Sequence, residues 1–90
     1  MLDTLITSQP RINLLIRFFA HSRNQGYLRG LAEEFGESSN AVRIELNRLE
    51  KAGMLISYPV RNRKIYQANK DFQLFTEIRS LVLKHLKLDK

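Results

Sequence analysis

Three basic side chains fall within four consecutive positions of the stretch SYPVRNRKIYQAN, which contains no acidic residue. They are Arg61, Arg63 and Lys64, and the residues around them predict two strands, at about 54–60 and 63–69, joined at the basic positions. Like charges this close repel one another, so the turn of this hairpin is either fully solvated or contacts an anionic partner. Such a row of cations neutralises phosphates and releases their counterions.

A second group of polar side chains is expected on one helix. This helix is capped by Ser38 or Ser39, continues through NAVRIELNRLEKAG and ends at Gly53. At about 100° per residue, its inward arc holds Val42, Leu46 and Leu49, and its outward arc holds Asn40, Arg43, Ile44 and Asn47. Arg pairs with guanine and Asn with adenine, and N–H groups at a helix start bind phosphate. The outward arc therefore suits base reading in a major groove.

Both groups also have a simpler interpretation. Any solvated helix has a polar face, and a basic turn can be an ordinary solvated turn. However, two Asn residues on one exposed face lower helix propensity without a packing return. Solvation also does not explain Ile44, which would contact either a thymine methyl group or a neighbouring element.

The composition predicts one small basic domain over residues 1–90, with a formal net charge of +6 and a pI near 10.1. A charge of this sign favours nucleic acid as a partner, then an anionic membrane surface, and otherwise only a soluble surface. No apolar run is long enough for a membrane span. The N-terminus lacks the basic region of a secretory signal, so we expect a cytoplasmic protein.

The remaining elements follow from caps and helical spacing. A first helix is capped by Ser8, has Pro10 in its first turn and ends near His21. Its inward residues are Ile12, Leu15, Ile16 and Phe19. A brief extended segment at Tyr27 and Leu28 precedes a short helix, LRGLAEEFG, with Leu31, Ala32 and Phe35 inward and Gly36 at its end. A last helix starts at Asp71 or Phe72 and runs to about Leu86.

The order helix, helix, helix, hairpin, helix is a helix-turn-helix followed by a basic hairpin, in a mainly α fold. The string YLRGLAEEFGESSNAVRIELNRLEKAGMLISYPVRNRKIYQAN resembles the ArsR-like winged-helix transcriptional regulators of bacteria and archaea, over about residues 27–69. The resemblance implies a winged helix-turn-helix that binds double-stranded DNA sequence-specifically. Asn40, Arg43 and Asn47, helped by Ser39, would contact bases, and Ser38, Arg61, Arg63 and Lys64 would hold phosphates. Glu33 and Glu34, on the first helix of the pair, are expected to face away from DNA.

Neither a metal site nor catalysis is expected. Regulators of this family that sense metals use cysteine clusters or Asp/His pairs, whereas this chain has no cysteine and its two histidines, His21 and His85, lie near opposite ends. We expect both histidines to be surface or terminal residues. No Gly-rich phosphate loop or nucleophile with a neighbouring base is present, and Glu45 and Glu50 are expected to be solvated. The sequence thus predicts a protein that is not an enzyme and carries no cofactor.

The two terminal helices carry more apolar residues than one core stripe needs. The last helix has Leu74, Phe75, Ile78, Leu81, Val82, Leu83 and Leu86, and the first has Leu14 and Phe18 on a separate face. An apolar surplus on a small domain predicts association, here a homodimer through these two helices. The alternative is that both helices simply wrap the core.

A different class of function is also open. In this alternative the domain is a protein-interaction module, with the wing docking an acidic surface or the terminal helices docking an apolar one. RNA binding is less favoured, because Tyr58 and Tyr66 are expected in strands and no exposed pair of aromatic residues is evident.

Overall fold

The computed structural model describes residue 6, residues 8–20 and residues 25–88. Its elements are α2 (Gln9–Phe19), β1 (Gln25–Gly26), α3 (Leu28–Phe35), α4 (Ser39–Lys51), β2 (Leu55–Val60), β3 (Arg63–Ala68) and α5 (Phe75–Leu88). The strands form one antiparallel sheet in the order β1-β3-β2. The expected mainly α fold with a small β-hairpin is therefore confirmed.

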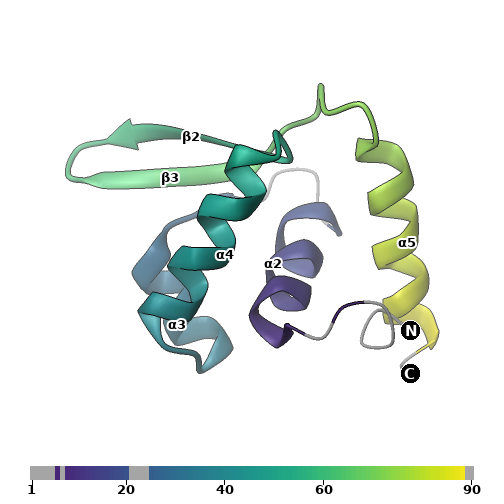
Figure 1. Cartoon of the computed structure of the whole chain (residues 1–90), viewed down its shortest axis with the longest axis horizontal. Helices are drawn as coiled ribbons and strands as arrows, with labels where there is room; N and C mark the ends of the chain where they lie inside the picture. The colour runs from purple at the N-terminus through teal and green to yellow at the C-terminus, as the bar shows by residue number, and fades with distance from the viewer. Residues whose placement is uncertain (1–5, 7, 21–24, 89–90) are drawn as a thin grey trace.

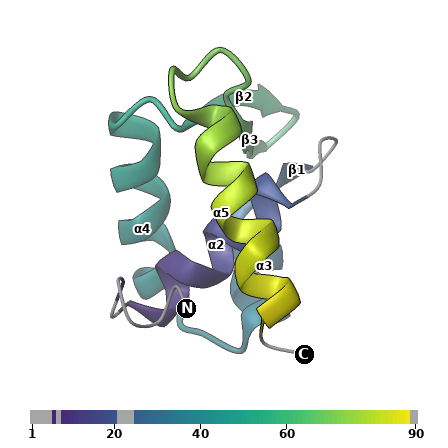
Figure 2. The same ribbon diagram turned by 90° about the vertical axis from the view of Figure 1, so that its right-hand side faces the viewer.

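Helix α2 lies at the centre of the molecule, with α4 on one side and α5 on the other (Figure 1, Figure 2). Ile12, Leu15 and Phe19 belong to the core as expected, but Leu14 and Phe18 are also buried, with 0% of each residue exposed. The expectation that Leu14 and Phe18 form spare apolar surface is wrong. A helix covered from two sides has two buried stripes, and both belong to the core.

The helices of the predicted helix-turn-helix begin and end where local signals place them. Gly36 follows α3 in the left-handed region, at φ 66°, which a residue without a Cβ adopts at no steric cost. The Ser38 hydroxyl then accepts a hydrogen bond from the Ala41 N–H at 3.1 Å and caps α4. Ser8 caps α2 in the same way, accepting from the Arg11 N–H at 3.3 Å.

The extended segment lies two residues earlier than expected. Strand β1 consists of Gln25 and Gly26, whereas Tyr27 is the N-cap of α3 and Leu28 is its first residue. Strand β1 pairs with β3, which follows almost forty residues later in the chain. This tertiary pairing, absent from any local pattern, selects residues 25–26 for the strand.

Helix α5 begins at Phe75, later than the expected start at Asp71 or Phe72. Asn69 is the cause. Its side-chain oxygen accepts a hydrogen bond from the Asp71 N–H at 3.1 Å, and its amide donates to the Gly53 carbonyl at 2.9 Å. This local bonding competes with helix formation, so the chain crosses from the sheet to α5 through turns.

The outer ends of the terminal helices lie close to the expected positions. Helix α2 ends at Phe19, and His21, the expected neighbourhood of its end, lies outside the described residues. Helix α5 continues to Leu88, beyond the expected Leu86. Within the described ranges, no helix combines the length and apolar character needed to cross a membrane.

Strands β2 and β3 and the turn between them, residues 55–68, are called the wing below. Their register runs from Leu55 opposite Ala68 to Val60 opposite Arg63, which confirms the expected hairpin. Arg61, in the two-residue turn, has φ 58°, a left-handed conformation that L side chains rarely adopt.

Candidate nucleic-acid interface

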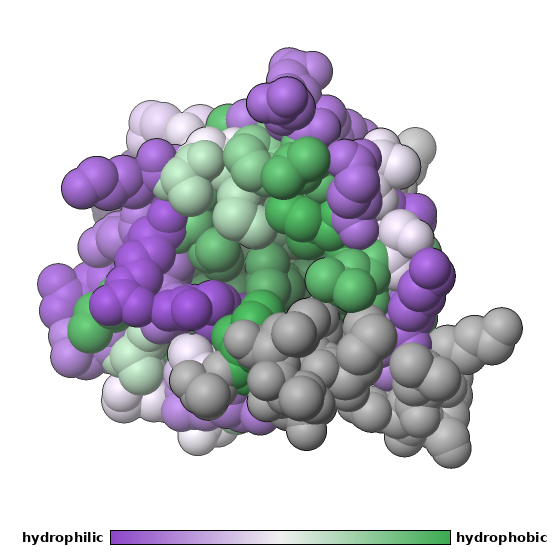
Figure 3. Space-filling model, turned by 45° about the vertical axis from the view of Figure 1, so that its right-hand side comes forward, coloured by the Kyte–Doolittle hydropathy of each residue, from purple (hydrophilic) through white to green (hydrophobic). Residues whose placement is uncertain are grey.

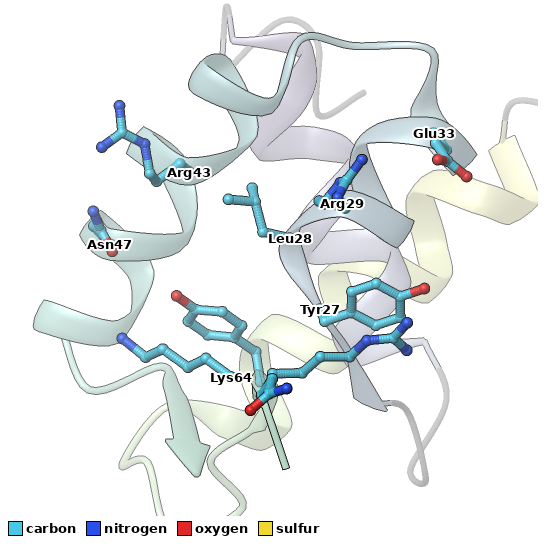
Figure 4. A pocket seen from close by; sticks show the side chains of 10 residues that line it. Tyr27, Leu28, Arg29, Glu33, Arg43, Asn47 and Lys64 are labelled. Carbon is cyan, nitrogen blue, oxygen red and sulfur yellow. The ribbon is translucent and has the colours of Figure 1, made fainter. Parts of the chain in front are cut away.

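An open groove of about 680 Å³ lies between α3, α4 and the wing. Figure 4 shows Arg43 and Asn47 on α4 across from Leu28 on α3, with Lys64 reaching in from the wing. The groove is lined by Tyr27, Leu28, Arg29, Glu33, Arg43, Asn47, Asn62, Arg63, Lys64 and Tyr66. Four of these side chains are cationic, so the groove has the electrostatic character that attracts a polyanion.

The structure brings half of the sequence-predicted site residues into this groove. These are Arg43, Asn47, Arg63 and Lys64. The other four do not line it: Ser38, Ser39 and Asn40 lie at the start of α4, and Arg61 lies at the turn of the wing. All eight are solvent-exposed and therefore accessible to a large partner.

The polar residues at the start of α4 form local hydrogen bonds. The Arg43 guanidinium donates to the side-chain oxygen of Asn40, one helical turn earlier. The Ser38 oxygen already accepts its capping bond, so its hydroxyl hydrogen is the group left to donate to an incoming phosphate. Asn40 and Arg43 are thus hydrogen-bonded neighbours on the outward face of α4.

Arg63 is held against an aromatic ring. Its guanidinium carbon lies 4.2 Å from the centre of the Tyr27 ring, a cation–π contact that joins the wing to the start of α3. Gly30 makes this arrangement possible, because a Cβ there would come within 2.9 Å of the Tyr27 ring. The stack limits where the Arg63 guanidinium can point.

Tyr27 and Arg29 line the groove although the sequence did not indicate them as site residues, and one acidic residue lies on another face than expected. Arg29 is an exposed cation at the start of α3, a signal available in the sequence, whereas the role of Tyr27 depends on the wing folding back over it. Glu34 bonds to Arg17 at 2.9 Å, away from the groove. Glu33 instead lines the groove, so its expected orientation away from this face is wrong.

Lys64 has an acidic partner that the sequence of the hairpin does not reveal. Its ammonium group donates to Glu50, in the last turn of α4, at 3.1 Å, and the Ser57 hydroxyl donates to the same carboxylate. The Ser57 bond, with Lys64 adding to it, holds the pKa of Glu50 below its ordinary value. The bond to Glu50 raises the pKa of Lys64. The expectation that Glu50 is simply solvated is wrong.

Glu45 is a buried acid on the inner side of α4, where it too was expected to be solvated. Arg11 on α2 donates to it at 2.7 Å and Ser8 at 3.3 Å, and Arg48 lies 3.7 Å away. Burial alone would raise the pKa of Glu45, but the bond and charge of Arg11, with Arg48 and Ser8, outweigh it and lower that pKa. This cluster fixes α4 to the N-terminal end of α2.

Both histidines were expected to be surface or terminal residues. His85 lies near the C-terminal end of α5 but is buried, with 6% of the residue exposed, so it is not a surface residue. His21 lies outside the described residues. Within the described part of the chain, His, Cys, Asp and Glu side chains form no group of three or more suited to a metal ion.

No protein-family model and no curated protein sequence match the chain. Solved structures of the same fold include AF1382 from Archaeoglobus fulgidus, which aligns with a TM-score of 0.75 at 15% sequence identity over 100% of this chain and 98% of its own. They also include MepR, a transcription regulator of the Staphylococcus aureus multidrug efflux pump MepA. It aligns with a TM-score of 0.64 at 17% identity over 99% of this chain and 70% of its own. Likeness at these identities establishes the fold, a winged helix, while the resemblance to ArsR-like regulators stays a prediction.

Proposed function

We propose that this protein is a DNA-binding transcriptional regulator of the ArsR-like type that recognises a double-stranded site. Helix α4 enters the major groove, where Asn40, Arg43 and Asn47 contact base edges with help from Ser39. Arg61, Arg63, Lys64 and Ser38 contact the phosphate backbone beside it. The protein acts by binding rather than by catalysis, and it works in the cytoplasm, where bacterial and archaeal DNA is found.

The observation that carries this proposal is the shared groove. Helix α4 and the wing belong to separate parts of the sequence, yet Arg43, Asn47 and Arg63 line the same open concavity. Amide and guanidinium groups that can read bases therefore stand beside cations that can hold the adjoining phosphates. A solvated surface has no requirement for this juxtaposition.

Ile44 fits the same face. It lies on the outward arc of α4 and 43% of the residue is exposed, so no neighbouring element covers it. Of the two alternatives for this residue, contact with a thymine methyl group is the one that an exposed position supports.

The proposal includes a homodimer, now confined to the last helix because Leu14 and Phe18 are core residues. Leu74, the residue before α5, recurs at helical spacing with Ile78 and Leu81 within it, and Leu74 and Leu81 are 50% and 37% exposed. Figure 3 shows apolar surface gathered on the side of the molecule where α5 comes forward. A twofold dimer would place two copies of α4 about one DNA turn apart.

The test is fluorescence anisotropy of a labelled mixed-sequence duplex, titrated with the protein at low and near-physiological salt. We expect binding that weakens steeply as salt rises, because neutralised phosphates release counterions. Absence of binding at low salt would contradict the proposal and would make a protein-interaction module, docking an acidic or apolar surface, the leading function.

A further inference from the structure

One carboxylate at the end of α4 contacts both strands of the wing. Glu50 accepts hydrogen bonds from Ser57 on β2 and from Lys64 on β3, the latter at 3.1 Å. Ser57 and Lys64 project from the same face of the hairpin, because Ser57 lies opposite Tyr66 and Pro59 lies opposite Lys64. The Glu50 side chain thus contacts both β2 and β3 on one face of the hairpin.

Glu50 is placed to carry a charge in this position. Its side chain is 30% exposed, so it is partly shielded from water but not deeply buried. The Ser57 hydrogen bond favours the ionised form, and the Lys64 ammonium balances the charge. The contact is therefore a charge-assisted tie between the helix and the hairpin.

The three cations of the wing differ in their surroundings. Arg63 is stacked on Tyr27, 4.2 Å from the ring centre. Among the described residues, neither Arg61 nor Arg63 forms an ion pair, whereas Lys64 is paired with Glu50. A phosphate approaching Lys64 has to compete with a carboxylate already bound to it.

We propose that Glu50 is a positioning residue that ties the wing to α4 and withholds Lys64 from phosphate, so that Arg61 and Arg63 are the wing's principal backbone contacts. This inference rests on the proposed function and changes one of its assignments, because Lys64 is then not a phosphate contact while it is bonded to Glu50. The tie fixes the angle between the wing and α4, which decides whether the base contacts and the phosphate contacts form together. It also lowers the number of counterions that the wing releases on binding.

Glu50→Gln tests whether Glu50 keeps Lys64 from binding phosphate, because the substitution removes the charge while retaining the shape of the side chain. Each phosphate neutralised makes the slope of log K against log salt more negative, and therefore steeper, by about 0.9. In Glu50→Gln we expect the slope to steepen by about 0.9 as Lys64 becomes free to bind phosphate. Glu77→Gln, on α5, makes the same change in net charge away from the wing and should leave the slope as in the wild type.

A double-mutant cycle with Lys64→Met assigns the effect to this pair. We expect Lys64→Met to reduce the slope by about 0.9 more in the Glu50→Gln background than in the wild type. Equal reductions in both backgrounds would overturn the inference, because Lys64 would then contact phosphate despite Glu50. An unchanged slope in Glu50→Gln would overturn it as well.

An NMR titration of the free protein separates this inference from the proposed function. The pKa of the Lys64 ammonium should lie above its ordinary value in the wild type and return toward it in Glu50→Gln. Identical Lys64 titration in the two proteins would overturn the tie, whether or not DNA binds. Salt-independent or absent DNA binding by the wild type would instead contradict the proposed function, and a raised Lys64 pKa would still support the tie.

Discussion

At the scale of single residues, Arg43 and Arg61 are both exposed cations, but their positions predict different roles in the proposed DNA binding. Arg43 lies in the groove, bonded to Asn40 on α4, whereas Arg61 lies at the turn of the wing. A side chain that contacts a base edge affects the choice between sequences, and one that contacts phosphate affects all sequences alike.

Arg43→Ala should therefore reduce the preference for the selected site by about 1–3 kcal/mol while changing the affinity for random DNA much less. Arg61→Ala should weaken binding to the selected site and to random DNA alike, and it should make the slope of log K against log salt shallower by about 0.9. Anisotropy titrations with a selected duplex and its scrambled counterpart measure both effects. Arg79→Ala, on α5, serves as the charge-matched control. Equal losses on both duplexes for both variants would contradict this division.

The conformation of Arg61 yields a second prediction at this scale. At φ 58° an Arg residue is strained, and Gly relieves the strain while losing the cation. Arg61→Gly should raise the free energy of unfolding by about 0.5–1 kcal/mol and yet weaken DNA binding. Thermal or urea unfolding measures the first effect and anisotropy the second.

Arg61→Asn is the matched comparison, because Asn tolerates the left-handed region better than Arg and also lacks the charge. Both variants should bind DNA with similar weakness. A free energy of unfolding below that of the wild type in both variants would show that Arg61 does not strain the turn.

At the scale of elements, the position of α4 depends on a buried ion pair. Glu45 has a side chain that is 9% exposed, and its partner Arg11 is 33% exposed. Removing Arg11 leaves a carboxylate desolvated without its main partner, which is costlier than loss of an exposed pair. The orientation of α4 against α2 is thus secured at the middle of α4, where Glu45 lies between Arg43 and Asn47.

Arg11→Ala should lower the free energy of unfolding by roughly 2 kcal/mol near pH 7, less than a fully buried pair because Arg11 is partly exposed. Arg48→Ala, which removes a mostly exposed arginine 3.7 Å from the same carboxylate, should change it by about 0.5 kcal/mol or less. Urea unfolding of the three proteins measures the difference. Equal effects of the two substitutions would contradict a special role for Arg11.

The effect of Arg11→Ala should also depend on pH. The pKa of Glu45 is lowered from its ordinary 4.5 in the folded wild type, so its stabilising contribution is present above about pH 4.5 and is lost as the pH falls through the folded pKa. In Arg11→Ala this contribution is already missing. The stability difference between the two proteins should therefore shrink below pH 4.5, and a constant difference across that range would contradict the pairing.

Local signals predicted most elements but few of the contacts between them. The Ser38 cap, Gly36 and the apolar arc of α4 are encoded within a few residues, and the structure confirms each. The Arg11–Glu45 pair joins residues 34 positions apart, so its partners become evident only after the helices are packed. The same holds for Tyr27, whose ring meets Arg63 only because β1 draws the start of α3 against β3.

At the scale of the whole molecule, α2 is central and its apolar residues are taken up by the core. The surplus of apolar residues that the sequence indicated is therefore confined to α5 and the residue before it, where Leu74 and Leu81 remain exposed. If this stripe forms a twofold contact, its residues are buried against their own copies.

Leu81→Glu should convert a dimer into a monomer, because it places a charge in the proposed contact. Sedimentation equilibrium across a range of concentrations measures the change, and circular dichroism checks that the fold is retained. Ile56→Glu, at a similarly exposed apolar position on β2, is the matched control and should remain dimeric. A wild-type protein that is monomeric at high concentration would contradict the dimer.

The pairing of β1 with β3 has a mechanical consequence. It reaches only Gln67 and Tyr66, so the outer part of the wing is a two-stranded ribbon clamped at its base. The contacts of Ser57 and Lys64 with Glu50 attach the hairpin to α4 farther along its length. Only the residues around the turn then extend beyond these contacts. A segment this short has little freedom to bend away from the rest of the wing. We therefore expect the wing to keep a nearly constant angle to α4 in the free protein.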